Sequence, residues 1–155
     1  MIDFSQAYHQ GIRVPDLDLA MEELGASLGL TWCEPQDRQQ AVWMPDVGDI
    51  TVPLRFTYSS AGPQHLELLQ GAPGSIWDGR EAPGLHHIGV WCDDVAAGTA
   101  ELVELGWTLR LAQRGPAEGY GSFTYVQPPS GLIVELVWSR IRPMFDRWFA
   151  GGPLG

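Results

Sequence analysis

The sequence repeats one pattern in its two halves. Residues 8–24 read YHQGIRVPDLDLAMEEL, and residues 86–102 read HHIGVWCDDVAAGTAEL. The alignment places His9 on His87, and the offset of 78 positions is about half of the 155-residue chain. A repeat of this length predicts two copies of one supersecondary unit, each made of a strand, a turn, a helix and further strands.

Each copy also ends alike, with one glutamate inside an apolar strand pattern. Glu67 lies in QHLELLQ and Glu135 lies in GLIVELVW. Successive side chains of a strand point to opposite faces, so each half directs one histidine (His9 or His87) and one glutamate to one surface. Isolated buried carboxylates are costly, whereas a divalent ion offsets that cost. We therefore expect these four residues to form a metal site.

The repeated segments resemble the vicinal oxygen chelate superfamily, which contains glyoxalase I, methylmalonyl-CoA epimerase, extradiol dioxygenases and bleomycin resistance proteins. The matching pieces are HQGIRVPDLDLAM, HLELL, LHHIGVWCDDV and PPSGLIVELV. The resemblance implies an α+β fold in which two tandem βαβββ modules form a curved, partly closed mixed sheet around a cavity, with helices outside. It also implies that the first and last strands of each module supply the metal ligands, which fall on His9, Glu67, His87 and Glu135.

We expect one domain with two modules, at about residues 5–70 and 84–140. A linker rich in Gly and Pro at residues 71–83 would join them, and a tail would follow at 141–155. An apolar stripe behind a cap at Asp16 predicts a helix from Leu17 to about Gly29. A second stripe behind a cap at Asp94 predicts one from Val95 to about Gly106. The aromatic tail suits a short amphipathic helix that buries its apolar face on its own chain or on a second subunit. The resemblance implies a homodimer.

Composition narrows the range of partners. The formal net charge is −10 with only nine Lys and Arg, which argues against nucleic acid and favours a small organic molecule. No apolar run approaches the roughly 20 residues that cross a bilayer, and the first ten residues lack a signal-peptide pattern, so we expect no membrane contact and a cytoplasmic protein. Cys33 and Cys92 are expected to be reduced, packed thiols.

Further side chains could contact a substrate. His65 shares the face of Glu67 and could line the cavity or act as an alternative ligand. Arg13 and Trp91 lie further along the histidine-bearing strands, where they could grip an anionic or aromatic group or simply stack on each other. The remaining candidates for substrate binding are Trp43, Arg55 and Tyr125.

The ligand set suggests a chemistry. Imidazole and carboxylate groups without thiolate suit Ni, Co, Zn, Mn or Fe, and such an ion polarises a carbonyl and stabilises an enolate. Glu135, and secondarily Glu67, are the candidates for combined ligand and acid or base. The sequence therefore predicts an isomerase or lyase that acts on a small carbonyl or acyl substrate through enolate-type proton transfer.

Two alternatives stay open. The first is a metal-free binding or resistance protein that sequesters an aromatic small molecule, which the seven tryptophans would suit. The second is an extradiol-type dioxygenase. The resemblance implies two histidines and one glutamate for that class, so a ligand at Glu67 would fill a position that oxygen activation needs.

Overall fold

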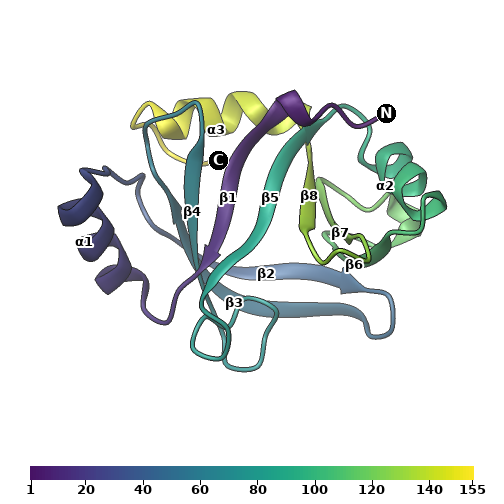
Figure 1. Ribbon diagram of the computed structural model, residues 1–155, viewed down its shortest axis with the longest axis horizontal. Helices are drawn as coiled ribbons and strands as arrows, with labels where there is room; N and C mark the ends of the chain where they lie inside the picture. The colour runs from purple at the N-terminus through teal and green to yellow at the C-terminus, as the bar shows by residue number, and fades with distance from the viewer. The chain divides into compact units, whose positions relative to one another are not determined.

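The computed structural model describes all 155 residues and has an α+β architecture with eight strands and three α-helices. The order strand, helix and three strands occurs twice along the chain, and a helix follows (Figure 1). None of the helices has the length and apolar character that crossing a membrane requires. The elements are β1 (Ala7–Arg13), α1 (Leu17–Leu28), β2 (Gln36–Met44), β3 (Gly48–Tyr58), β4 (His65–Gly71), β5 (Gly84–Cys92), α2 (Val95–Glu104), β6 (Thr108–Ala112), β7 (Phe123–Gln127), β8 (Ile133–Trp138) and α3 (Arg142–Phe149).

The chain divides into two compact units, which are described in turn. Unit 1 comprises Met1–Tyr8, Ala41–Thr51 and His87–Arg142, and unit 2 comprises His9–Gln40, Val52–His86 and Pro143–Gly155. Each unit is therefore assembled from separate stretches of the sequence. The boundaries of the two modules and of the linker stay predictions.

Unit 2 is built on a parallel pair of strands with a helix on one face. β1 runs parallel to β4 with Gly11 opposite Glu67, and β3 pairs antiparallel with β4. On the face opposite Glu67, α1 places Leu17 against Val14 and Leu68. The Asp16 carboxylate accepts a hydrogen bond from the Leu19 backbone N–H at 2.9 Å and caps the helix, as the sequence predicts.

Unit 1 repeats this plan. β5 runs parallel to β8 with Gly89 opposite Glu135, β7 pairs antiparallel with β8, and β6 pairs with β7. α2 starts at the expected Asp94 cap and packs Val95 and Leu102 into a cluster with Leu136. In both units, therefore, the helix covers the strand face that points away from the glutamate.

The predicted linker is packed rather than extended. Trp77 within it is buried, and Gly79 lies so close to Val14 that a β-carbon would sit 2.3 Å from the Val14 carbonyl group. The Asp78 carboxylate accepts hydrogen bonds from the backbone N–H groups of Gly74 and Arg80, at 2.8 and 3.0 Å. The hydrogen bonds shape the segment itself, and its packing against Val14 leaves no room at Gly79 for a side chain larger than hydrogen.

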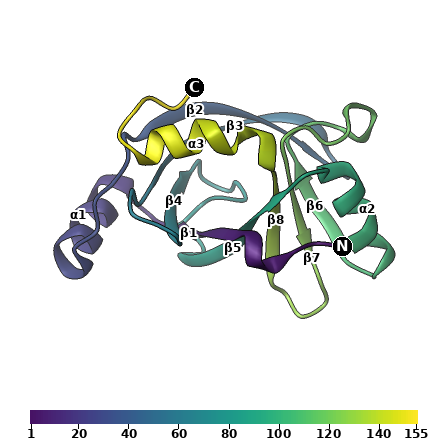
Figure 2. The ribbon, with the colours of Figure 1, turned by 90° about the horizontal axis from the view of Figure 1, so that it is seen from above.

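The tail forms the expected amphipathic helix and packs on its own chain. Trp148 is 1% exposed, and its ring meets Phe56 and Tyr58 edge-on at centroid distances of 5.9 and 5.5 Å. Phe149 stacks on His65 of β4. Figure 2 shows the ribbon of α3 beside β4. The hydrophobic face of α3 is thus buried within unit 2.

Candidate functional site

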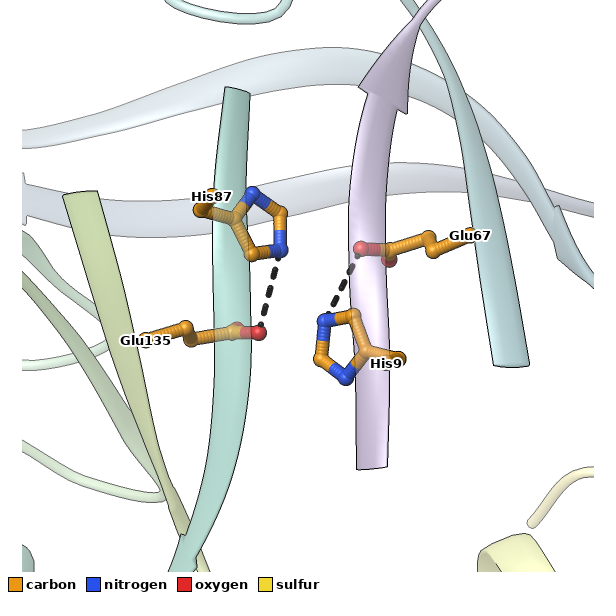
Figure 3. A group of neighbouring side chains, drawn as sticks. All are labelled: His9, Glu67, His87 and Glu135. Atoms are coloured by element: carbon orange, nitrogen blue, oxygen red, sulfur yellow. Dashed lines mark ion pairs between the residues drawn. The ribbon is translucent and has the colours of Figure 1, made fainter. Parts of the chain in front are cut away.

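The His9 and Glu67 side chains form a buried pair in unit 2. The His9 Nε2 atom lies 3.3 Å from the Glu67 Oε2 atom (Figure 3). His9 is 0% exposed and Glu67 is 7% exposed. The pair arises because Gly11, two residues after His9 on β1, lies opposite Glu67 on β4, and the absence of a side chain at Gly11 leaves room for the carboxylate.

Unit 1 contains the equivalent pair with the same geometry. The His87 Nε2 atom lies 3.3 Å from the Glu135 Oε2 atom. The exposures are 0% for His87 and 8% for Glu135. Gly89 takes the place of the glycine on β1, since it lies opposite Glu135. The predicted pairing of one histidine with one glutamate is therefore present in each half of the chain.

The spacing within each pair fits two ligands of one ion. Metal–nitrogen and metal–oxygen bonds of about 2.1 Å at the angles of roughly 90–110° found around divalent ions place N and O about 3.0–3.4 Å apart. A charge-assisted hydrogen bond between an imidazolium and a carboxylate is shorter, at about 2.7–2.9 Å. The observed 3.3 Å and the donor types, imidazole nitrogen and carboxylate oxygen, therefore suit a bound metal.

A tyrosine side chain lies beside each His–Glu pair. Tyr125 lies opposite Glu135 on β7 and its ring centre is 4.8 Å from that of His87. Tyr58 lies opposite Glu67 on β3 and its ring meets the His9 ring edge-on at 5.0 Å. Tyr125 is among the residues expected from the sequence to contact a substrate, whereas Tyr58 is not. The alternation in VPLRFTY could have found it, since a tyrosine stands in the strand next to the glutamate in both halves.

His65 shares the face of Glu67, as predicted, and is 7% exposed. Its Nδ1 atom lies 2.6 Å from the Ser59 carbonyl oxygen, so this nitrogen carries the proton and donates it. Burial lowers the pKa of His65 below its usual range, which favours the neutral imidazole. Phe149 stacks on the ring at 3.8 Å. His65 is therefore packed into unit 2 by the tail.

The proposed substrate contacts Arg13 and Trp91 both have partners in the protein. Arg13 donates from Nη1 to the Ile76 carbonyl oxygen at 3.2 Å. Trp91 stacks on Tyr8, with ring centres 3.9 Å apart and an angle of 11° between the planes. Each residue is thus held in place by its own unit without a ligand.

The surroundings of Trp43 and Arg55 differ from those of the His–Glu pairs. Trp43 is half-buried on β2 and its ring lies 6.4 Å from that of Tyr120. Arg55 lies opposite Gln70, on the other strand face from Glu67. It forms ion pairs with Asp18 at 3.2 Å and Asp37 at 2.9 Å. The structure therefore brings Tyr125 beside a His–Glu pair but not Arg55.

Comparisons with known proteins show that this fold occurs in other structures. Solved structures with the same fold include a Streptomyces coelicolor methylmalonyl-CoA epimerase variant in complex with 2-nitronate-propionyl-CoA. It is 24% identical, has a TM-score of 0.57, and the match covers 86% of this chain and 93% of that one. The methylmalonyl-CoA epimerase of Mycobacterium tuberculosis is 20% identical with a TM-score of 0.60, over 86% and 87% of the two chains.

A hypothetical protein of Bacillus halodurans has the same fold, with 18% identity, a TM-score of 0.61 and coverage of 85% and 92%. No curated protein matches the sequence significantly. The sequence profile of the glyoxalase/bleomycin resistance protein/dioxygenase superfamily matches residues 8–126, which is more than half of the chain. The chain belongs to this superfamily.

Proposed function

We propose that the two His–Glu pairs bind one divalent ion and that the protein is a metal-dependent isomerase or lyase of small carbonyl or acyl compounds. The observation that carries this proposal is that the two pairs have the same geometry. Both have a 3.3 Å separation between Nε2 and Oε2, both are buried, and both have a glycine opposite the glutamate. Together the four residues are a group that could hold a metal ion.

The protein's own residues would supply the ligands, the base and a dry environment. His9, Glu67, His87 and Glu135 would hold the ion. When bound, a divalent ion polarises a carbonyl oxygen of the substrate and makes the adjacent carbon more acidic. A carboxylate oxygen of Glu135, or secondarily of Glu67, would accept that proton and return it. The burial of both glutamates would keep water away from the reacting carbon.

Acyl-CoA thioesters are the first substrates to test. The structural neighbours include methylmalonyl-CoA epimerases, among them a complex with 2-nitronate-propionyl-CoA. An epimerase moves a proton at the carbon beside a thioester carbonyl, which is the chemistry that a metal–carboxylate site supports. Tyr125 and His65 are proposed substrate contacts because they lie beside the pairs. For Arg13, Trp91, Trp43 and Arg55 the same role is proposed on the sequence alone.

Deuterium exchange tests this function. The protein, loaded in turn with Ni, Co, Zn, Mn and Fe(II), would be incubated in D₂O with acyl-CoA epimers and with thiol adducts of 2-oxoaldehydes. We expect loss of the proton signal beside the carbonyl in the NMR spectrum. Glu135→Gln should slow exchange by roughly 100–10,000-fold, the range of general acid–base catalysis. Glu22→Gln, an exposed change on α1, is the matched control and should leave the rate unchanged.

Two results would argue against this function. Tight binding of an aromatic ligand that EDTA does not disturb, in protein that takes up no metal, would favour sequestration. Ring cleavage of a catechol with oxygen consumption by the Fe(II)-loaded protein would favour a dioxygenase. The homodimer is a separate proposal, and sedimentation equilibrium tests it.

A further inference from the structure

The C-terminal helix α3 touches the strand face that carries the His9–Glu67 pair. Tyr58 lies opposite Glu67 and contacts the His9 ring at 5.0 Å. Its own ring lies 5.6, 5.5 and 5.7 Å from three aromatic rings of α3. Those three rings belong to Phe145, Trp148 and Phe149. One tyrosine therefore contacts both the proposed ligand His9 and three aromatic side chains of α3.

A second contact joins α3 to β4, the strand that carries Glu67. Phe149 stacks on His65 with ring centres 3.8 Å apart and 13° between the planes. His65 lies two residues before Glu67 on β4 and on the same strand face, and it is the register partner of His9. Tyr58 on β3 and His65 on β4 are thus both in contact with aromatic rings of α3.

The ring of Trp148 fills space without a hydrogen bond. Trp148 is 1% exposed, and its indole N–H is buried with no acceptor. A buried donor without a partner costs free energy, so the indole contributes through its volume and its ring contacts. The neighbouring Arg147 is exposed and donates only to the Pro143 carbonyl oxygen of its own helix. The inner face of α3 is thus aromatic and its outer face is polar.

We propose that α3 is a steric filter for the metal site, with Trp148 and Phe149 as its specificity-determining residues. The helix occupies the room beside Tyr58 and His65 that a bulky substrate group or a chelator would need to approach His9 and Glu67. On this side the site therefore admits small groups only. The inference rests on the proposed function in one respect, which is that His9 and Glu67 hold an ion.

The test compares substitutions on the two faces of α3. Trp148→Ala removes the buried ring, and Phe149→Ala removes a half-buried ring and is the milder change in case Trp148→Ala does not fold. Trp148→Phe keeps an aromatic ring and drops the N–H. Arg147→Ala, on the exposed face, is the matched control. Circular dichroism confirms folding of each variant.

Two reaction rates measure how accessible His9 is. With metal-loaded protein, the rate of metal transfer to excess EDTA is measured. With metal-free protein, the rate of carbethoxylation of His9 by diethyl pyrocarbonate is measured by peptide mass spectrometry. For Trp148→Ala and Phe149→Ala, we expect both rates to rise by about 10-fold or more, because access no longer needs local opening of α3. Indole added to Trp148→Ala should refill the space and slow both reactions again.

For Trp148→Phe and Arg147→Ala, both rates should stay within about 2-fold of wild type. The filter is refuted if folded Trp148→Ala and Phe149→Ala carbethoxylate His9 at the wild-type rate. Failure of the proposed metal site is distinguishable. In that event no variant takes up metal, yet the carbethoxylation of His9 in metal-free protein still reports whether α3 controls access.

Discussion

Unit 1 and unit 2 carry the same pair of buried side chains on the same strand register, but they differ in what covers that pair. In unit 1 the α-helix is α2, which packs Val95 and Leu102 against Leu136 on the strand face that points away from Glu135. In unit 2, α1 packs behind the sheet in the same way, and α3 adds an aromatic layer on the face with the pair.

This difference separates the residues that form a pair from the residues that surround it. The parts that the two units share, namely the glycine opposite the glutamate and the tyrosine beside the histidine, build the pairs. The part that they do not share, α3, changes only the surroundings of one pair. Ligand chemistry is therefore common to both units, whereas the restriction of access belongs to unit 2.

The largest expected effect tests whether the two pairs act as one site. His9→Ala and His87→Ala should each reduce bound metal from about one ion per chain to near zero, because each removes a ligand of the same ion. The loss of affinity should exceed the roughly 10–100-fold cost of losing a group that only orients a ligand. Elemental analysis of protein dialysed against trace metal measures it, with Glu22→Gln as the control.

A different stoichiometry would break the comparison. If each unit bound its own ion, the wild type would hold two ions per chain and each histidine variant would keep one. That outcome would contradict a single shared ion and would turn the two pairs into independent sites.

The next effect compares the cores behind the two pairs. Leu68 in unit 2 and Leu136 in unit 1 are both 0% exposed and each packs toward the helix of its unit. Leu68→Ala and Leu136→Ala should each lower the free energy of unfolding by about 2–5 kcal/mol. Urea denaturation measures the loss. Leu19→Ala, at an exposed position of α1, should change it by less than about 0.5 kcal/mol.

A large loss of unfolding free energy for one leucine variant and none for the other would show that the cores of the two units do not stabilise the protein equally. In that case the equal geometry of the pairs would rest on the sheet register alone. We expect instead that both helices hold their sheets with comparable strength.

The smallest expected effect is a difference in alkylation rate between the two cysteine thiols. Burial raises the pKa of Cys33 in unit 2 to about 11 and also raises the pKa of Cys92 in unit 1. At about pH 8 both are thiols rather than thiolates, and thiolate is the reactive form, so both should alkylate more slowly than an exposed cysteine. Cys92 should react first, because it is half-buried while Cys33 is buried. Iodoacetamide labelling followed by mass spectrometry measures the order, and unfolded protein serves as the control.

The rates should rise with pH for both residues, since the thiolate fraction grows as the pH approaches the pKa. Labelling of Cys33 before Cys92 in native protein would mean that unit 2 opens more readily than unit 1. That result would also weaken the case for a tightly held α3.

Much of the local structure could be read from the sequence. The helix after β1 begins at Leu17 behind the Asp16 cap and ends before Gly29, where the backbone is left-handed, as the pattern predicted. The second helix begins behind Asp94 in the same way. Strand alternation correctly put each histidine and glutamate on one face. These features depend on residues near in sequence, so local patterns are enough to predict them.

Two features were missed because they depend on residues that are distant in the sequence. Arg55 alternates with Phe56 and Tyr58 along β3, but only the register of β3 against β4 shows that Tyr58, and not Arg55, shares the face of Glu67. In the segment expected to be a linker, only the close approach of Gly79 to Val14 shows that the chain is packed there.

The sequence by itself determined the repeated order of strand, helix and strands, the positions of the helices and the presence of one histidine and one glutamate in each half, since these follow from short-range patterns and their repetition. Only the tertiary structure decided that α3 folds back on its own chain, because an aromatic face can bury itself equally well against any apolar surface. The hydrophobic effect has no direction, so Tyr58, His65 and Phe56 were selected as the partners of α3 by where β3 and β4 place them.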